Sequence, residues 1–375
     1  MSWKSIIGQS RIKQLLMASL EHGRLAHAYL FVGEAGLGKY PTALELAKCV
    51  NCQQSPFDAC DTCPSCARVK ELQHPNLSLV FPLPVGKYEK SNDPPLSKLS
   101  DADISALKQE LKLKAENPYH QIRLERASEI KVNSIREIRR QAAFKSFDTG
   151  RKVFIILDAE KMNEESSNAF LKTLEEPTPD TLFILLTARQ EALLPTIVSR
   201  CQVIRFDQLS EKDLGYALVD RYHVPYDDAV TAARLANGSF IRAHQYVDRG
   251  TTDRKETAVN FLRTILSKSR KEINDRILEL DSEYKRRDFT EMFLFLQQWF
   301  RDAMRMREEV AGSQDVPDRG SIDKFNSNFP AWEYTNTIEV LERSISLLDK
   351  NVYIPLILIN VAHNLRRAIG EKKTN

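Results

Sequence analysis

The stretch Gly33–Tyr40, which reads Gly-Glu-Ala-Gly-Leu-Gly-Lys-Tyr, decides the fold of this chain. It matches the phosphate-binding loop pattern Gly-x-x-x-x-Gly-Lys-Ser/Thr at every position except the last. In that pattern backbone N–H groups wrap a phosphate and the lysine reaches the β- and γ-phosphates, so Gly33, Gly36, Gly38 and Lys39 are candidate nucleotide-binding residues. Tyr40 replaces the hydroxyl that ligates Mg²⁺, and its side chain is too long and rigid to put an oxygen in that place. Nucleotide binding by this loop is therefore an open question, and hydrolysis is in doubt.

The sequence around the loop predicts an α/β core. An apolar run at 27–32 predicts a buried strand before the loop, and a helix is expected from Pro41 onward. Further apolar runs at 152–158, 181–187 and 203–206 predict strands that alternate with helices, which indicates a parallel sheet covered on both faces. The core is expected to span residues 1–206.

Two other regions differ in composition from this core. Residues 82–117 are polar and rich in proline, and they predict an insertion with at most one short helix around 104–113, to which we assign no chemistry. Beyond residue 207 the strand signals stop and apolar residues recur at helical spacing. We expect the rest of the chain to be all helical, divided into a small domain at 207–249 and a larger one at 250–375.

A cysteine cluster follows the predicted loop helix. Cys52, Cys60, Cys63 and Cys66 have the spacing C-x7-C-x2-C-x2-C, which is typical of a closed tetrahedral site for structural Zn²⁺. The alternative is a set of free thiols in a loop. Cys49 lies three residues before Cys52 and could reach the same site, but we interpret it as a small buried apolar residue.

A second catalytic feature of nucleotide motors, the pair of acidic residues at the end of a core strand, is changed as well. Such proteins end this strand in Asp-Glu, where the Asp helps to hold Mg²⁺ and the Glu polarises the attacking water. Here the sequence reads Asp158-Ala159-Glu160, so the glutamate position is alanine and Glu160 is expected to point elsewhere. Asp158 fits a strand-end cap as well as a residual metal ligand. Both losses together predict poor hydrolysis of ATP, or none.

Composition excludes several function classes. The 375-residue chain has a formal net charge of +3, which gives no bulk electrostatic argument for nucleic acid binding. No apolar run approaches the length that spans a bilayer, and the first residues lack a signal-peptide pattern. We expect a cytoplasmic protein without a membrane partner.

These motifs resemble those of the AAA+ clamp-loader subunits of bacterial DNA polymerase III, most closely the delta-prime subunits. The resemblance covers residues 1 to about 210. It rests on Ile7–Gln9, His27–Phe31, the cysteine module after the loop helix, Asn168–Pro177, Thr187 at the sensor position and Ser199–Cys201.

The resemblance implies a heteropentameric ring that opens the sliding clamp and places it on primed DNA, with gamma/tau and delta subunits as partners. It further implies that 207–249 is a lid and 250–375 a collar domain. Taken alone, Arg200 is more typical of a surface arginine, but the family's Ser-Arg-Cys triplet supplies an arginine finger in trans to the ATP site of a neighbour. The expected function is a non-catalytic stator subunit. A gamma/tau-type ATPase is the alternative, and a separate zinc-containing DNA-binding protein is a third interpretation.

Overall fold

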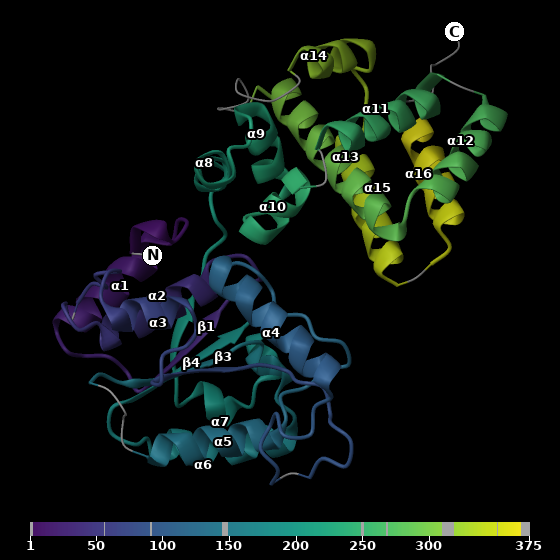
Figure 1. The fold of residues 1–375 in the computed structure, drawn as a ribbon. Helices are drawn as coiled ribbons and strands as arrows, with labels where there is room; N and C mark the ends of the chain where they lie inside the picture. Colours follow the sequence, from purple (N-terminus) through teal and green to yellow (C-terminus); the bar gives the residue numbers. More distant parts are fainter. Residues whose placement is uncertain are drawn as a thin grey trace. The chain divides into compact units, whose positions relative to one another are not determined.

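The computed structural model describes residues 3–55, 57–90, 92–144, 149–248, 251–267, 269–309, 319–350 and 352–368. The chain divides into two compact units (Figure 1). The first consists of Met1–Leu214 with Gly238–Ile241, and the second of Gly215–Asn237 with Arg242–Asn375.

The first unit contains a five-stranded parallel sheet. Its strands, in the spatial order β2-β3-β4-β1-β5, are β2 (Leu77–Val80), β3 (Lys152–Ile156), β4 (Thr181–Thr187), β1 (Ala28–Val32) and β5 (Gln202–Arg205). In the register of β1 with its two neighbours, Tyr29 of β1 lies opposite Ile184 of β4 and Gln202 of β5. The carboxyl ends of all five strands meet at one edge of the sheet, which is where ligands bind in open α/β sheets.

Helices cover both faces of this sheet (Figure 1). One face packs against α1 (Ser10–Glu21), α2 (Lys39–Asn51) and α3 (Pro64–Lys70), and the other against α5 (Val132–Ala143), α6 (Glu164–Glu175) and α7 (Pro195–Val198). Successive strand residues point to opposite faces, so Phe31 lies in the first core and Leu30 in the second. Because both faces are covered, β1, β3 and β4 are buried at every position. The predicted fold class, a parallel α/β core followed by helices, is confirmed.

The insertion at 82–117 holds more structure than its composition predicts. Helix α4 (Asp101–Glu116) has 16 residues and extends beyond both predicted ends of the expected short helix. It starts at a capping box in which the side chain of Ser100 accepts a hydrogen bond from the N–H of Asp103 and that of Asp103 accepts one from the N–H of Ser100. This local signal is readable in the sequence. Strand β2 and helices α3 and α5 were not predicted from the sequence either.

Beyond β5 the described residues form helices and connecting segments. The helices are α8 (Glu211–Tyr222), α9 (Tyr226–Leu235), α10 (Phe240–Asp248), α11 (Thr251–Ser267), α12 (Arg270–Glu283), α13 (Arg286–Arg307), α14 (Arg319–Asn328), α15 (Tyr334–Asp349) and α16 (Ile354–Arg367). Aromatic rings join α13 to α14 and to the start of α15, with Phe300 stacked on Trp332 at 5.5 Å and on edge to Phe325 at 5.8 Å. Among the described helices, none combines the length and the apolar character that a membrane crossing needs.

Replacing Phe170 by alanine should destabilise the α/β unit. Phe170 is fully buried on α6, and its ring meets that of Phe183 edge-on at 5.6 Å. A cavity of this size in a packed core costs about 3–5 kcal/mol of unfolding free energy. Phe144→Ala is the matched control, because that side chain is 65% exposed. Urea unfolding followed by circular dichroism measures the difference in unfolding free energy. Equal losses of stability in both variants would contradict the close packing of Phe170.

Candidate nucleotide and metal sites

The loop Gly33–Tyr40 connects β1 to α2 at the carboxyl edge of the sheet. Gly36 and Gly38 have φ angles of 88° and 93°, which side chains rarely adopt. A Cβ atom on Gly36 would also lie 2.2 Å from Oγ of Ser239 and 2.9 Å from the backbone N of Ile241. The backbone therefore requires glycine at positions 36 and 38, and residues 238–241 leave no room for a side chain at Gly36.

Lys39 folds back onto its own loop. Its Nζ donates hydrogen bonds to the carbonyl of Gly33 and, at 2.7 Å, to that of Glu34. Burial lowers the pKa of Lys39 to about 8, although the carboxylates of Glu160, Asp158 and Glu34 act in the opposite direction. The ammonium must leave these carbonyls before it can bind a phosphate.

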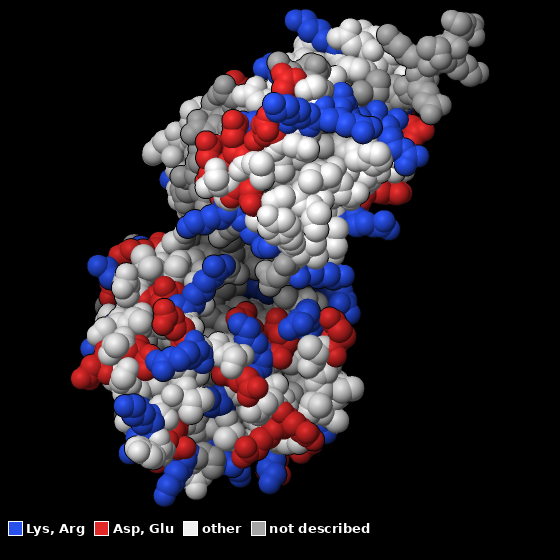
Figure 2. All heavy atoms as spheres, turned by 90° about the vertical axis from the view of Figure 1, so that its right-hand side faces the viewer, with Lys and Arg blue, Asp and Glu red and all other residues white. Residues whose placement is uncertain are grey.

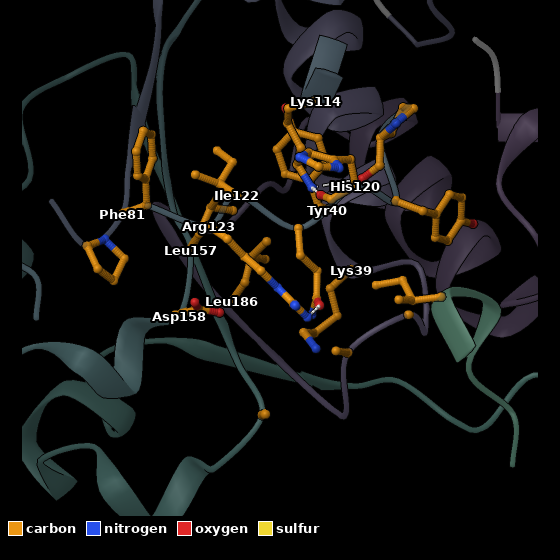
Figure 3. A pocket seen from close by; sticks show the side chains of 18 of the residues that line it. Lys39, Tyr40, Phe81, Lys114, His120, Ile122, Arg123, Leu157, Asp158 and Leu186 are labelled. Atoms are coloured by element: carbon orange, nitrogen blue, oxygen red, sulfur yellow. Dashed lines mark hydrogen bonds between the residues drawn. The ribbon is translucent and has the colours of Figure 1, made fainter. Parts of the chain in front are cut away.

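Tyr40 closes the place where a magnesium ligand is expected. Its ring is buried, and its hydroxyl has no hydrogen-bond partner among the described residues, so burial raises the pKa of this phenol. The Nζ of Lys114, from α4, lies 3.8 Å from the centre of the ring (Figure 3). Lys114 also donates to the carbonyls of Pro118 and His120, at 2.9 and 2.5 Å. Burial lowers the pKa of Lys114 to about 7, and Asp158 opposes the shift.

These residues line a pocket of about 430 Å³ at the carboxyl edge of the sheet. It brings together the glycine loop, Asp158 after β3, Thr187 at the end of β4, and residues 118–124, which follow the insertion. The sequence predicted roles for the glycine loop, Asp158 and Thr187, but it gave no sign of residues 118–124. Figure 3 shows Arg123 extending from residues 118–124 across the pocket toward Lys39.

The acidic strand end offers only one carboxylate to this pocket. Asp158 lines it and pairs with Lys161 at 3.0 Å. Ala159 is fully buried, and Oε1 of Glu160 accepts a hydrogen bond from the N–H of Ala188 at 3.3 Å. Among the described lining residues, none supplies a second carboxylate that could activate water.

Arg200 lies just after α7, outside the set of described residues that line the pocket. Its Nη2 donates to Oε1 of Glu175 at 2.7 Å, and its Nη1 donates to the carbonyl of Thr196 at 2.9 Å. The side chain is 34% exposed, so this guanidinium is held in one direction while part of it faces solvent.

The four predicted cysteine ligands lie together between α2 and α3. The Sγ atoms of Cys52, Cys60, Cys63 and Cys66 all lie within 4.8 Å of one another, so they could hold a metal ion. None of the four forms a disulfide. The N–H groups of Cys60, Cys63 and Cys66 donate to the sulfurs of Cys52, Cys60 and Cys63, at 3.5, 3.3 and 3.4 Å. Such bonds favour thiolates, which are the metal-binding form. The donor set fits a tetrahedral ion.

Cys49 is fully buried in the core and groups with Glu45 and Asp58 instead of the four cysteines. Burial raises the pKa of its thiol to about 12. The side chain of Lys48 pairs with Glu45 at 2.7 Å and with Asp61 at 2.5 Å, so α2 is tied to the cysteine loop by a buried ammonium. Burial also raises the pKa of Glu45 to about 7.

A parallel α/β sheet with a glycine loop between β1 and α2 places the protein in the phosphate-loop class. Within that class, the chain belongs to the family described as "DNA polymerase III, delta subunit", whose model matches residues 8–210.

Curated relatives agree with this assignment. The "DNA polymerase III subunit delta'" of Bacillus subtilis is 31% identical over 226 residues, which cover 60% of this chain and 56% of that protein. The protein of the same name from Haemophilus influenzae is 24% identical over 345 residues, or 91% of each chain. The "DNA polymerase III subunit tau" of B. subtilis is 29% identical over 210 residues, which is 56% of this chain and 30% of that protein. The predicted resemblance to delta-prime subunits is confirmed.

Replacing Lys114 by methionine should change how stability depends on pH. The pKa of this lysine is about 7 in the fold and about 10.5 in the unfolded chain. Between these values the unfolded chain binds the extra proton, so the unfolding free energy of the wild type rises with pH, by at most about 1.4 kcal/mol per pH unit from this group. Lys114→Met removes that contribution. Its stability relative to the wild type should therefore fall as pH rises above about 7.

Urea unfolding at several pH values tests this expectation. Lys112→Met is the control, since that side chain is 77% exposed and lies two residues away on the same helix. A difference between wild type and Lys114→Met that does not change with pH would contradict it.

Proposed function

We propose that this chain is a non-catalytic, delta-prime-type subunit of a bacterial clamp loader, which acts as a stator and helps to load the sliding clamp onto primed DNA. The observation that carries the proposal is the loss of two catalytic groups, one at Tyr40 in the pocket and one at Ala159, next to the pocket residue Asp158. Tyr40, whose ring is covered by Lys114, occupies the position of a magnesium ligand. Ala159 occupies the position of the carboxylate that activates water. A motor that lacks both can bind phosphate but has no means of activating water.

Arg200 is the residue that we assign to a neighbour's ATP site. An arginine finger must be exposed and must be held in a fixed direction, because its contribution comes from placing charge at the transition state. Arg200 meets both requirements through its exposure and its two hydrogen bonds, to Glu175 and to the carbonyl of Thr196. The partner subunit would be of the gamma/tau type.

The same family membership supports a proposal for the assembly. We propose that residues 207–249 act as the lid and 250–375 as the collar, through which the chain joins gamma/tau and delta subunits in a heteropentamer. Contact with primed DNA is then a property of the complex. Figure 2 fits this view, because Lys and Arg are interspersed with Asp and Glu over the α/β unit on that face and form no basic stripe there.

We further propose that Cys52, Cys60, Cys63 and Cys66 hold one structural Zn²⁺. Four thiolates leave no open coordination position, so the ion would fix the turn between α2 and α3 and take no part in chemistry. Metal binding would also contribute directly to the folding of this turn.

The gamma/tau-type ATPase is the alternative function. Gamma/tau proteins are also relatives of this chain, at 27% identity over 270 residues for that of Mycobacterium tuberculosis strain H37Rv. The two changed catalytic positions weigh against this alternative.

Replacing Arg200 by alanine should lower ATP hydrolysis by a clamp loader reconstituted with gamma/tau and delta subunits. The affected site should lose about 10³-fold or more in turnover, and the complex should lose that site's share of the steady-state rate. Arg200→Lys should not restore it, because an ammonium lacks the fork of guanidinium donors. Arg136→Ala is the matched control, as Arg136 is also an exposed arginine paired with a helix glutamate, Glu165, at 3.2 Å.

Assembly of the complex, followed by native mass spectrometry, should be the same for both variants. Unchanged hydrolysis with Arg200→Ala would remove the finger assignment. Turnover by the isolated chain that disappears with Lys39→Ala would favour the gamma/tau alternative.

Freshly purified protein should contain about one zinc per chain, and Cys63→Ser should reduce this content sharply because three thiolates hold Zn²⁺ more weakly than four. Cys49→Ala is the control, because Cys49 is not part of the group of four. The zinc content of this variant should stay near that of the wild type. Elemental analysis by plasma mass spectrometry gives the measurement. Wild-type protein without zinc, or equal loss in both variants, would contradict the site.

A further inference from the structure

A groove of about 670 Å³ lies between α12 and α16 in the second unit. Its floor is aliphatic and comes from both helices, with Ile273 and Ile277 on α12 and Ile359 and Ala362 on α16. These residues recur every three or four positions, so one face of each helix forms one wall. Ile359 is 45% exposed, which leaves part of the aliphatic surface open to solvent.

The cations of this groove gather at one end. Arg270 is the first residue of α12, and Arg366 and Arg367 lie in the last turn of α16. The two helices run in opposite directions, so the start of α12 and the end of α16 lie toward the same end (Figure 1). Figure 2, which faces the right-hand side of Figure 1, shows a band of Lys and Arg across this unit beside uncharged residues.

Negative charge does not balance these cations within the groove. Among its described lining residues there is no carboxylate, and the sequence of α16 contains no Asp or Glu. His363 and Asn274 are the other polar residues that line it. A concave surface with this charge favours an anionic ligand.

The position of Arg270 is not explained by the stability of its own helix. The helix dipole disfavours a cation in the first turn, and α12 is already capped by the reciprocal hydrogen bonds of Ser269 and Glu272. Arg366 and Arg367, by contrast, complement the dipole at the end of α16. Arg270 therefore points to a ligand more directly than the other two arginines do.

The chemistry of the floor separates a peptide from a nucleic acid. Unpaired bases bind on aromatic rings, and none of the described residues of this groove is aromatic. An aliphatic hollow instead accepts the bulky apolar side chains that anchor peptides in grooves. The arginines at its end suit carboxylates, which guanidinium groups bind through two parallel hydrogen bonds.

We propose that the groove between α12 and α16 binds an acidic peptide segment of a partner protein. Bulky apolar side chains of the segment lie on the aliphatic floor, and adjacent carboxylates pair with Arg270, Arg366 and Arg367. This inference goes beyond the proposed function and does not depend on it, because the groove lies within the second unit and involves no ATP site.

The test is fluorescence anisotropy of a labelled peptide, Asp-Asp-Asp-Asp-Leu-Phe, titrated with the full chain. Binding should saturate and should weaken as salt is added. Arg270→Glu should weaken it by at least about 10-fold, because the variant loses a charge-assisted hydrogen bond and repels the peptide. Ile359→Asp should weaken it as well, because a carboxylate then meets the apolar side chains of the peptide.

Lys271→Glu is the matched control. Lys271 is exposed, follows Arg270 on the same turn and does not line the groove. Both charge reversals place a carboxylate in the first turn of α12, so their effects on the helix should be alike. Lys271→Glu should keep most of the wild-type affinity, and thermal melting followed by circular dichroism should be the same for the two variants.

Several results would overturn the inference. They are the absence of saturable binding, equal affinity in wild type and Arg270→Glu, and equal affinity for the peptide Asp-Asp-Asp-Asp-Ser-Ser. Displacement of the peptide by an equimolar oligodeoxythymidylate would assign the groove to single-stranded DNA instead.

Assembly with gamma/tau and delta subunits provides a separate measurement. Native mass spectrometry should show that Arg270→Glu joins the complex as the wild type does. Loss of assembly would assign the groove to packing between subunits and would overturn the peptide assignment. Either outcome leaves the role of Arg200 intact, since that role is measured by hydrolysis at a neighbour's site.

Discussion

The buried helix α2 is the constraint on which both candidate sites depend. Eleven of its 13 residues are buried, and it runs from Lys39 of the glycine loop to the residue just before Cys52. Lys48 adds a buried ion pair with Glu45 and a second one with Asp61 in the cysteine loop. Removing one partner of a buried ion pair costs more free energy of folding than the intact pair contributes. These contacts therefore favour one position of the cysteine loop relative to α2. The glycine loop and the cysteine cluster therefore lie at the two ends of one buried helix.

The same burial explains how a tyrosine can occupy the magnesium position. At an exposed helix start, Tyr40 could turn its ring away, and the glycine loop would stay open to a metal. Here α2 begins inside the core, so the ring is packed on one side and covered by Lys114 on the other. A buried ammonium is costly, and the carbonyls of Pro118 and His120 with the aromatic face offset only part of this cost, because burial still lowers the pKa of Lys114 to about 7. Lys114 of the insertion therefore covers the face of Tyr40 that the core leaves open.

The sequence predicts the parts of this structure that depend on local pattern. Apolar runs identify β1, β3 and β4, and the glycines identify the loop, because each signal lies within a few residues. Strand β2 escapes prediction since it is a four-residue edge strand that includes Ser78. Arg123 escapes it for a different reason. Its position depends on the contact of Tyr119 with Phe240, which lies 121 residues further along the chain, and no local pattern encodes such a contact.

The side chains of Arg200 and Lys39 are held in different ways. The pair of Arg200 with Glu175 is partly exposed on both sides, and such pairs contribute at most about 1 kcal/mol. The hydrogen bond to the carbonyl of Thr196 is a second contact that fixes the direction of the guanidinium. Lys39, by contrast, is partly buried against its own loop, where its Nζ donates to the carbonyls of Gly33 and Glu34. The guanidinium of Arg200 therefore stays partly open to solvent, whereas the ammonium of Lys39 is turned back onto its own loop.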